Sequence, residues 1–215
     1  MRPAAVVTAG PTLEAIDPVR FLSNRSSGKQ GYAIAAALRD TGFDVTLVSG
    51  PTALDDLAGV TMVRVESALD MLAAVQGALP ADVFVAVAAV SDWRPAETAS
   101  HKLKLDKAAA TALPLVENPD ILKTIANLAP PRRPRLVIGF AAETHDVAEH
   151  ARDKRRRKGC DWIVANDVSG DAMGGADNAA LIITGHDEAV MERAAKAEIA
   201  ARLVERIAAA LGRPD

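Results

Sequence analysis

The chain has 215 residues, which suits one domain or one domain with a small appendage. Hydrophobic residues make up 49% and charged residues 25%, and the net charge is −3, which disfavours nucleic acid as the main partner. No apolar run reaches the roughly 18 residues of a membrane span, and the single cysteine, Cys160, excludes an internal disulfide framework. We therefore expect a cytoplasmic protein with no nucleic-acid or membrane partner. The first predicted strand starts almost at Met1. We therefore expect no signal peptide, and we expect the chain to be one half of a longer protein.

Short aliphatic runs alternate with helical stretches along the chain. In order, we expect a strand at 4–8, a helix at 29–40, strands at 44–48 and 60–65, a helix at 67–79, a strand at 82–88, a helix at 119–128, a strand at 135–140, a helix at 145–158, a strand at 161–165, an edge strand at 180–184 and a helix at 191–211. This alternation predicts an α/β fold with a Rossmann-like, doubly wound, mostly parallel sheet.

One segment, at about 92–115, breaks the alternation. It contains Pro95, several charges and an Ala-rich patch, and it predicts short strands around 102–105 and 111–115. We interpret it as a protruding excursion from a single domain over 1–215: a lid, an arm or a dimer contact.

Small or polar residues follow five of the predicted strands. Ligands of open α/β sheets bind beyond the carboxyl ends of the strands. The segments that follow these strands are 9–12, 49–51, 89–92, 141–144 and 166–167. One shared ligand-binding edge is the favoured interpretation, although ordinary loops also collect small polar residues.

The segment S-N-R-S-S-G-K-Q-G at 23–31 leads into the first predicted helix. Hydroxyls and glycines at a helix N-terminus expose backbone N–H groups that bind anions. The spacing matches neither a P-loop nor a dinucleotide fingerprint. An anion site and a plain Ser-capped helix therefore remain equal alternatives.

Two polar side chains near this segment are candidates for holding an anionic substrate. Arg20 offers a planar fork for carboxylate or phosphate, and Asn24 lies close to it in the sequence. The alternative for Arg20 is a surface salt bridge with Glu14 or Asp17.

Lysines later in the chain are candidates for holding phosphates. Lys102 and Lys104 alternate, so they share one face of a predicted strand, and Lys154 and Lys158 are i, i+4 neighbours on a predicted helix. Solvated lysines on an edge strand and on a helix face are the competing interpretations.

The remaining titratable residues give weaker signals. Asp92 and Asp167 can ligate magnesium or a ribose hydroxyl, but lone carboxylates prove little. The four histidines show no metal-ligand spacing. Cys160, just before a strand, is expected to be a small buried hydrophobe and not a nucleophile.

A set of short motifs runs through nearly the whole chain. They are T-A-G-P-T at 8–12, D-P-V-R-F-L-S-N-R-S-S-G-K at 17–29, A-A-V-S-D-W-R-P at 88–95, K-L-K at 102–104, N-P-D-I at 118–121, G-F-A-A-E-T at 139–144, K-R-R-R-K at 154–158 and A-N-D-V at 165–168. In this order they resemble the phosphopantothenoylcysteine synthetases, the synthetase half of the bacterial Dfp or CoaBC proteins. Gln30 stands where bacterial relatives often carry Met, and Trp93 where Tyr is common.

The resemblance implies a ligase of coenzyme A biosynthesis. In that reaction the carboxylate of 4′-phosphopantothenate attacks the α-phosphorus of CTP, and the amine of L-cysteine then displaces CMP to form the amide. The resemblance also implies Mg²⁺ or Mn²⁺ as the metal, a homodimer formed through the excursion, and fusion to or assembly with a flavin-dependent decarboxylase. We expect no flavin domain in this chain.

The resemblance also assigns site residues. Lys102 serves activation, Asn24 holds the acyl intermediate with Arg20 nearby, and Ser26, Ser27 and Gly28 join Arg20 and Asn24 around the substrate. The nucleotide-binding positions are Ala88, Ala89, Asp92, Lys102, Pro119, Asp120, Ile121, Leu122, Phe140, Lys154 and Lys158.

Two other functions compete with this one. A short-chain NAD(P)-dependent reductase shares the sheet, but Tyr32 lacks a lysine four residues on and the glycine fingerprint is missing. A non-catalytic nucleotide-sensing module would bind the same nucleotide without chemistry. The residues alone do not decide between CTP and ATP.

Overall fold

The computed structural model describes residues 2–104, 112–143, 146–167 and 177–212. Within these ranges one sheet is built from β1 (Ala4–Ala9), β4 (Asp44–Ser49), β5 (Thr61–Arg64), β6 (Val83–Ala86), β9 (Leu136–Glu143), β10 (Trp162–Asp167), β11 (Asp177–Ile183) and β12 (Glu188–Ala195). The strand order is β12-β11-β10-β9-β6-β1-β4-β5. From β5 to β10 all neighbours pair in parallel, whereas β11 and β12 are antiparallel additions. The predicted mostly parallel, doubly wound sheet is confirmed.

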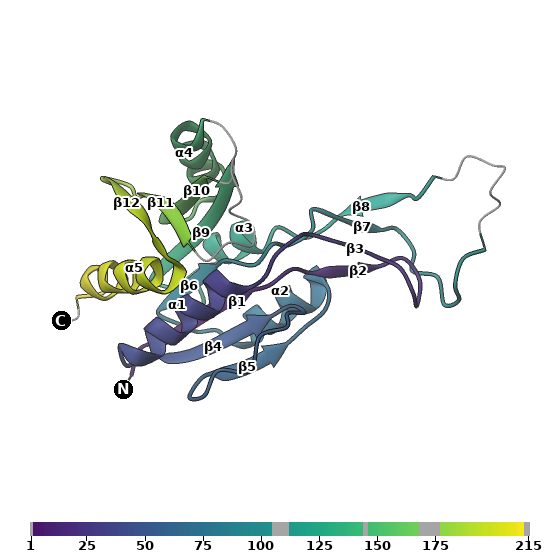
Figure 1. Ribbon diagram of the computed structural model, residues 1–215, viewed down its shortest axis with the longest axis horizontal. Helices are drawn as coiled ribbons and strands as arrows, with labels where there is room; N and C mark the ends of the chain where they lie inside the picture. Colours follow the sequence, from purple (N-terminus) through teal and green to yellow (C-terminus); the bar gives the residue numbers. More distant parts are fainter. Residues whose placement is uncertain (1, 105–111, 144–145, 168–176, 213–215) are drawn as a thin grey trace.

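Helices cover both faces of this sheet (Figure 1). The described helices are α1 (Lys29–Asp40), α2 (Ala68–Gly77), α3 (Ile121–Ala126), α4 (Val147–Lys158) and α5 (Lys196–Ala210). Because side chains alternate along a strand, Val7 packs in one cluster with α1 and α5, while its neighbour Val6 packs in the other with α2, α3 and α4. Cys160 is buried in the second cluster, as expected, and burial raises the pKa of its thiol to about 11.

The sheet reverses its winding at β1. The chain moves from β1 to β4 and β5 on one side, then returns through α2 to β6 on the other side of β1. The ends of β1 and β6 therefore separate at a switch point, which is where open α/β sheets bind their ligands.

An arm projects from the body along the long axis of the molecule (Figure 1). Its described strands are β2 (Leu13–Ala15) paired with β3 (Phe21–Ser23), and β7 (Trp93–Pro95) paired with β8 (Leu115–Glu117). The arm was expected, but its strands were placed wrongly. Residues 102–104 form no strand, because Asp17 and Arg20 take the backbone N–H and C=O of Leu103, and β8 starts only at Leu115. Residues 105 and 111 lie outside the described ranges.

The C-terminal part corrects two further expectations. The predicted edge strand at 180–184 lies inside the sheet as β11, and β12 covers the first residues of the predicted helix at 191–211. Glu, Arg and Ala favour a helix in this stretch, but pairing with β11 buries Met191 opposite Ala180 and overrides that preference. The helix starts only at Lys196. Among the described helices, none has the length and apolar character needed to cross a bilayer.

Candidate active site

Two adjoining cavities open beyond the carboxyl ends of β1, β6 and β9. The first cavity has a volume of about 470 Å³ and the second about 360 Å³. Both are lined by Ala88, Val90, Asp92, Phe140 and Lys154. The shared lining makes them two compartments of one cleft at the predicted ligand-binding edge.

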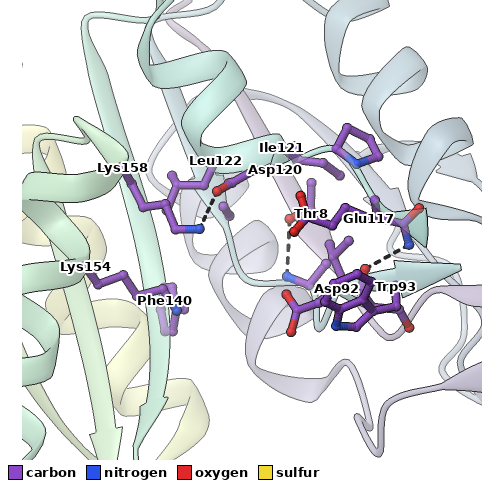
Figure 2. A pocket seen from close by; sticks show the side chains of 16 residues that line it. Thr8, Asp92, Trp93, Glu117, Asp120, Ile121, Leu122, Phe140, Lys154 and Lys158 are labelled. Atoms are coloured by element: carbon purple, nitrogen blue, oxygen red, sulfur yellow. Dashed lines mark hydrogen bonds and ion pairs between the residues drawn. The ribbon is translucent and has the colours of Figure 1, made fainter. Parts of the chain in front are cut away.

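Threonines of the T-A-G-P-T motif hold the loop that follows β6. The Thr8 hydroxyl accepts hydrogen bonds from the N–H groups of Val87 and Ala88, each at 3.2 Å, and Thr12 Oγ1 accepts from the N–H of Ser91 at 3.0 Å. These bonds fix the backbone between the two cavities. Thr8 itself lines the first cavity (Figure 2).

The turn before α3 forms another wall of the first cavity. Asp120 caps α3 by accepting a hydrogen bond from the N–H of Lys123 at 3.0 Å, and it forms an ion pair with Lys158 at the end of α4 (Figure 2). The Asn118 amide donates to the carbonyl of Ser91 at 2.9 Å. The turn is therefore tied both to α4 and to the loop after β6.

Phe140 and Lys154 stand where the two cavities meet. Phe140 comes from β9 and Lys154 from α4, and both are labelled in Figure 2 among the side chains that line the first cavity. With the apolar side chains of Ile121 and Leu122 nearby, the first cavity combines flat apolar surface with a cation. This composition suits a base and ribose whose phosphates point toward Lys154.

The second cavity contains the N-terminus of α1. Its N-cap, Gly28, has a φ of 75° and no side chain caps the helix, so backbone N–H groups of the first turn are available to a ligand. A Cβ at Gly28 would lie 2.7 Å from Thr52 Cγ2, which explains the glycine. Of the two alternatives for this segment, the Ser-capped helix is wrong.

Basic side chains surround this helix end. The described lining holds Arg25, Lys29, Lys154 and Lys196 against a single carboxylate, Asp92. Burial lowers the pKa of Lys196, and the nearby charge of Lys29 lowers it further. Such crowding of like charges favours an anionic ligand in the second cavity.

The arm carries the remaining polar candidates. The Asn24 amide donates to the carbonyl of Ala89 at 3.2 Å, which places it beside the cleft. Arg20 forms hydrogen bonds to Asp17 through Nε at 3.0 Å and Nη2 at 2.5 Å, the salt bridge that the sequence left open. These bonds, above all, hold the pKa of Asp17 well below its ordinary value. Lys102 is exposed on the arm.

The structure brings most of the predicted site residues together. The first cavity is lined by Ala88, Asp92, Pro119, Asp120, Ile121, Leu122, Phe140, Lys154 and Lys158, and the second by Ala89, Ser26, Ser27 and Gly28. Asn24 lies beside the cleft without lining it, whereas Arg20 and Lys102 lie on the arm and line neither cavity.

Several lining residues had been given no role. Thr8, Lys29 and Asn118 stand within the quoted motifs, so the motifs marked their positions without revealing their contacts. Lys196 carried no signal at all, because it was placed inside a predicted helix and not at the end of β12.

The donor set of the cleft fits a metal ion that arrives with a nucleotide. Within the described residues no three His, Cys, Asp or Glu side chains cluster as a metal site. Mg²⁺ in nucleotide sites, however, is commonly held by one or two carboxylates plus phosphates. Asp92, exposed and lining both cavities, meets that requirement. The side chain of Asp167 lies outside the described part of the chain.

Comparison with known proteins identifies the family of the chain. The profile of the DNA/pantothenate metabolism flavoprotein C-terminal domain matches residues 2–211. The coenzyme A biosynthesis bifunctional protein CoaBC of Vibrio vulnificus is 41% identical over 96% of this chain and 52% of its own length. The protein of the same name from Mycolicibacterium smegmatis is 44% identical over 98% and 54%.

A solved structure matches along nearly the full length of both chains. The crystal structure of the C-terminal domain of a CoaBC protein is 40% identical, covers 98% of this chain and 96% of its own, and superposes with a TM-score of 0.82. The present chain spans about half the length of the curated relatives it matches.

Proposed function

Because the chain belongs to the DNA/pantothenate metabolism flavoprotein C-terminal domain family, we propose that it joins 4′-phosphopantothenate to L-cysteine at the expense of CTP. The observation that carries the proposal is the two-part cleft. An uncapped helix N-terminus among basic side chains adjoins a cavity lined by Phe140 and the turn before α3. One compartment suits a nucleoside and the other its phosphates.

In the first step a carboxylate oxygen of phosphopantothenate attacks the α-phosphorus of CTP. The bond to the β-phosphate oxygen breaks, pyrophosphate leaves, and an acyl cytidylate remains. Attack of one anion on another requires screening of the triphosphate. We assign that screening to Lys154, Lys158 and the N–H groups of α1, with Lys102 serving activation.

In the second step the cysteine amine attacks the acyl carbon. The carbon–oxygen bond to CMP breaks, the amine loses a proton, and the amide forms. We assign the handling of the acyl intermediate to Asn24. The amide nitrogen of Asn24 donates one hydrogen to the carbonyl of Ala89, and its other hydrogen can be donated to an oxygen of the intermediate.

A divalent ion supplies charge neutralisation on the triphosphate when it is bound. Asp92 is the side chain we assign to holding Mg²⁺ or Mn²⁺ together with the nucleotide phosphates. We assign the orientation of the substrates to the side chains that line the two cavities. We propose CTP as the nucleotide on the family resemblance, since the described contacts do not distinguish it from ATP.

We also propose that the domain, residues 1–215, acts as a homodimer through the arm. Large apolar side chains are exposed there: Val19, Phe21, Trp93, Leu103, Leu113, Leu115 and Val116. An apolar surface of this kind is typical of a protein contact. Arg20 and Lys102 stand on the same arm, which agrees with a phosphopantothenate site close to the dimer contact.

The matched relatives are named bifunctional, and this chain spans about half of their length. We propose that it works in the cytoplasm, fused to or assembled with a flavin-dependent phosphopantothenoylcysteine decarboxylase, with neither nucleic acid nor a membrane as partner.

Pyrophosphate release tests the proposal. The purified chain is incubated with 4′-phosphopantothenate and Mg²⁺, with CTP and ATP side by side and then with L-cysteine. We expect release that requires phosphopantothenate and is faster with CTP. Nucleotide binding without any pyrophosphate release would replace the ligase with a nucleotide-sensing module.

A further inference from the structure

We propose that Asp17, a residue on the turn between β2 and β3, is a positioning residue that fixes the Lys102 segment on the arm. The inference rests on the proposed function, because it assigns to Asp17 the placement of the lysine that serves activation. It adds a residue to the machinery that acts without touching substrate.

Asp17 is built as an anchor. Its side chain is fully buried, with 0% exposed, although it carries a charge. Oδ1 accepts hydrogen bonds from the N–H groups of Val19 and Arg20 at 2.9 Å each. Oδ2 accepts from Arg20 Nε and Nη2 and from the N–H of Leu103 at 3.1 Å. A buried carboxylate with every oxygen engaged has one stable orientation.

The anchor reaches a segment that is distant in the sequence. Leu103 is 86 residues away, and both of its backbone polar groups are engaged, the N–H by Asp17 and the C=O by Arg20 Nη2 at 3.1 Å. The contact continues to the N-terminal side, where the N–H of Ala99 donates to the carbonyl of Ile16 at 3.0 Å. Asp17 and Arg20 therefore hold the two peptide units on either side of the Leu103 Cα atom.

The clamp determines where Lys102 can reach. Lys102 and Lys104 flank the clamped residue, and both side chains are exposed. Fixing the backbone between them restricts the volume that each flexible ammonium can explore. Displacements of about 1 Å at a catalytic group can cost roughly a hundred-fold in rate. A simple surface salt bridge would be exposed and local, whereas Asp17 is buried and joins two distant segments.

The test compares Asp17→Asn with a matched control. Asparagine keeps the size of the side chain but presents N–H groups to donors that need an acceptor. Asp56→Asn removes a carboxylate that also pairs with an arginine at 2.5 Å, here Arg64, on the body and outside the described linings of both cavities. Pyrophosphate release, the KM for CTP, the thermal midpoint, and hydrogen exchange at Leu103 are measured for both.

We expect Asp17→Asn to lower the kcat of pyrophosphate release roughly ten- to a hundred-fold with little change in the KM for CTP, and Asp56→Asn to match the parent chain. In a Lys102→Ala background the Asp17→Asn effect should disappear, because both act through the same lysine. The proposal would be overturned if Asp17→Asn lowered kcat by the same factor in the Lys102→Ala background as in the parent chain. It would also be overturned if the kcat of Asp17→Asn equalled that of Asp56→Asn.

Hydrogen exchange measures how firmly the Leu103 backbone is held, independently of enzymatic activity. In the unaltered protein the Leu103 amide should exchange slowly, and Asp17→Asn should accelerate it where Asp56→Asn does not. Rapid exchange at Leu103 in the unaltered protein refutes the clamp even if the variant folds poorly. An unaltered chain that is clamped but releases no pyrophosphate refutes the proposed function, and with it the assignment to activation.

Discussion

Lys154 is a basic side chain that lines both cavities, so its charge can act on a ligand in either one. We predict that Lys154→Gln weakens CTP binding roughly ten- to a hundred-fold, since hydrogen bonds to charged groups contribute about 1.5–3 kcal/mol. Titration calorimetry with CTP measures this without turnover. Arg157→Gln is the matched control, because Arg157 is exposed on the same helix and lines neither cavity. Equal affinities of the two variants would remove Lys154 from the nucleotide site.

The Asp17 carboxylate has a predictable effect on stability. Its hydrogen bonds from Arg20 lower its pKa from the ordinary value of 3.8, so the folded chain binds this proton less readily than the unfolded chain. The stabilisation is present above pH 3.8 and is lost as the pH falls through the lower folded pKa. We predict that Asp17→Asn is less stable than the parent at neutral pH and that the difference shrinks below pH 3.8. Urea unfolding across this range measures the difference, and a pH-independent gap would contradict the prediction.

At the scale of the elements, the start of α1 combines a backbone requirement with a binding role. We predict that Gly28→Ala destabilises the fold by about 1–2 kcal/mol or more, because a Cβ is strained at this positive φ and would lie 2.7 Å from Thr52 Cγ2. It should also weaken pyrophosphate binding by disturbing the first turn. Urea unfolding and calorimetry measure the two effects.

Gly59→Ala separates these effects. Gly59 has the same φ of 75°, but its nearest neighbour is the flexible side chain of Arg39. The Gly59→Ala variant should have a lower free energy of unfolding than the parent chain and the same affinity for pyrophosphate. If Gly28→Ala also binds pyrophosphate with unchanged affinity, the helix end does not hold phosphates.

The central strands and long helices could be predicted from the sequence because their signals are local. The run at β6 is apolar throughout, as in strands buried on both faces. The helix α1 has apolar residues along one face and Gly42 just after its end, so its predicted bounds agree with the observed helix. The short strands of the arm could not be predicted, because three residues are too few for an alternating pattern to mark a strand, and only the pairing with a neighbouring strand defines them. β12 could not be predicted because its Glu, Arg and Ala residues favour a helix, and only its pairing with β11 overrides that preference.

The cleft shows a similar division. The ordered motifs predicted the loop after β6, the turn before α3 and the lysines of α4, all of which meet in the cavities. They could not reveal that Lys196 lines the same cleft from the end of β12, because that contact follows from tertiary packing. The salt bridge between Arg20 and Asp17 is a local contact that stood among the alternatives, but the sequence could not show that the pair also holds Leu103, 86 residues away.

At the scale of the whole molecule, the arm exposes apolar side chains that the proposed dimer would cover. We predict that Phe21→Asp, at a side chain that is 56% exposed, converts the dimer to a monomer and reduces pyrophosphate release, because burying a charge at an apolar contact is costly. Sedimentation velocity measures the assembly state. Val190→Asp, on β12 and 79% exposed, should leave both unchanged. A monomeric parent chain at full activity would contradict the role of the arm.

In the proposed reaction a carboxylate is activated by transfer of a nucleotide and then captured by an amine in this one cleft. The experiment uses 4′-phosphopantothenate with ¹⁸O at both oxygens of its carboxylate, incubated with CTP, L-cysteine and the purified chain. Because the attacking oxygen stays on phosphorus when the amine displaces CMP, mass spectrometry should find one ¹⁸O in each CMP formed along with the amide. Amide formation with unlabelled CMP, or no CMP at all, would contradict the account.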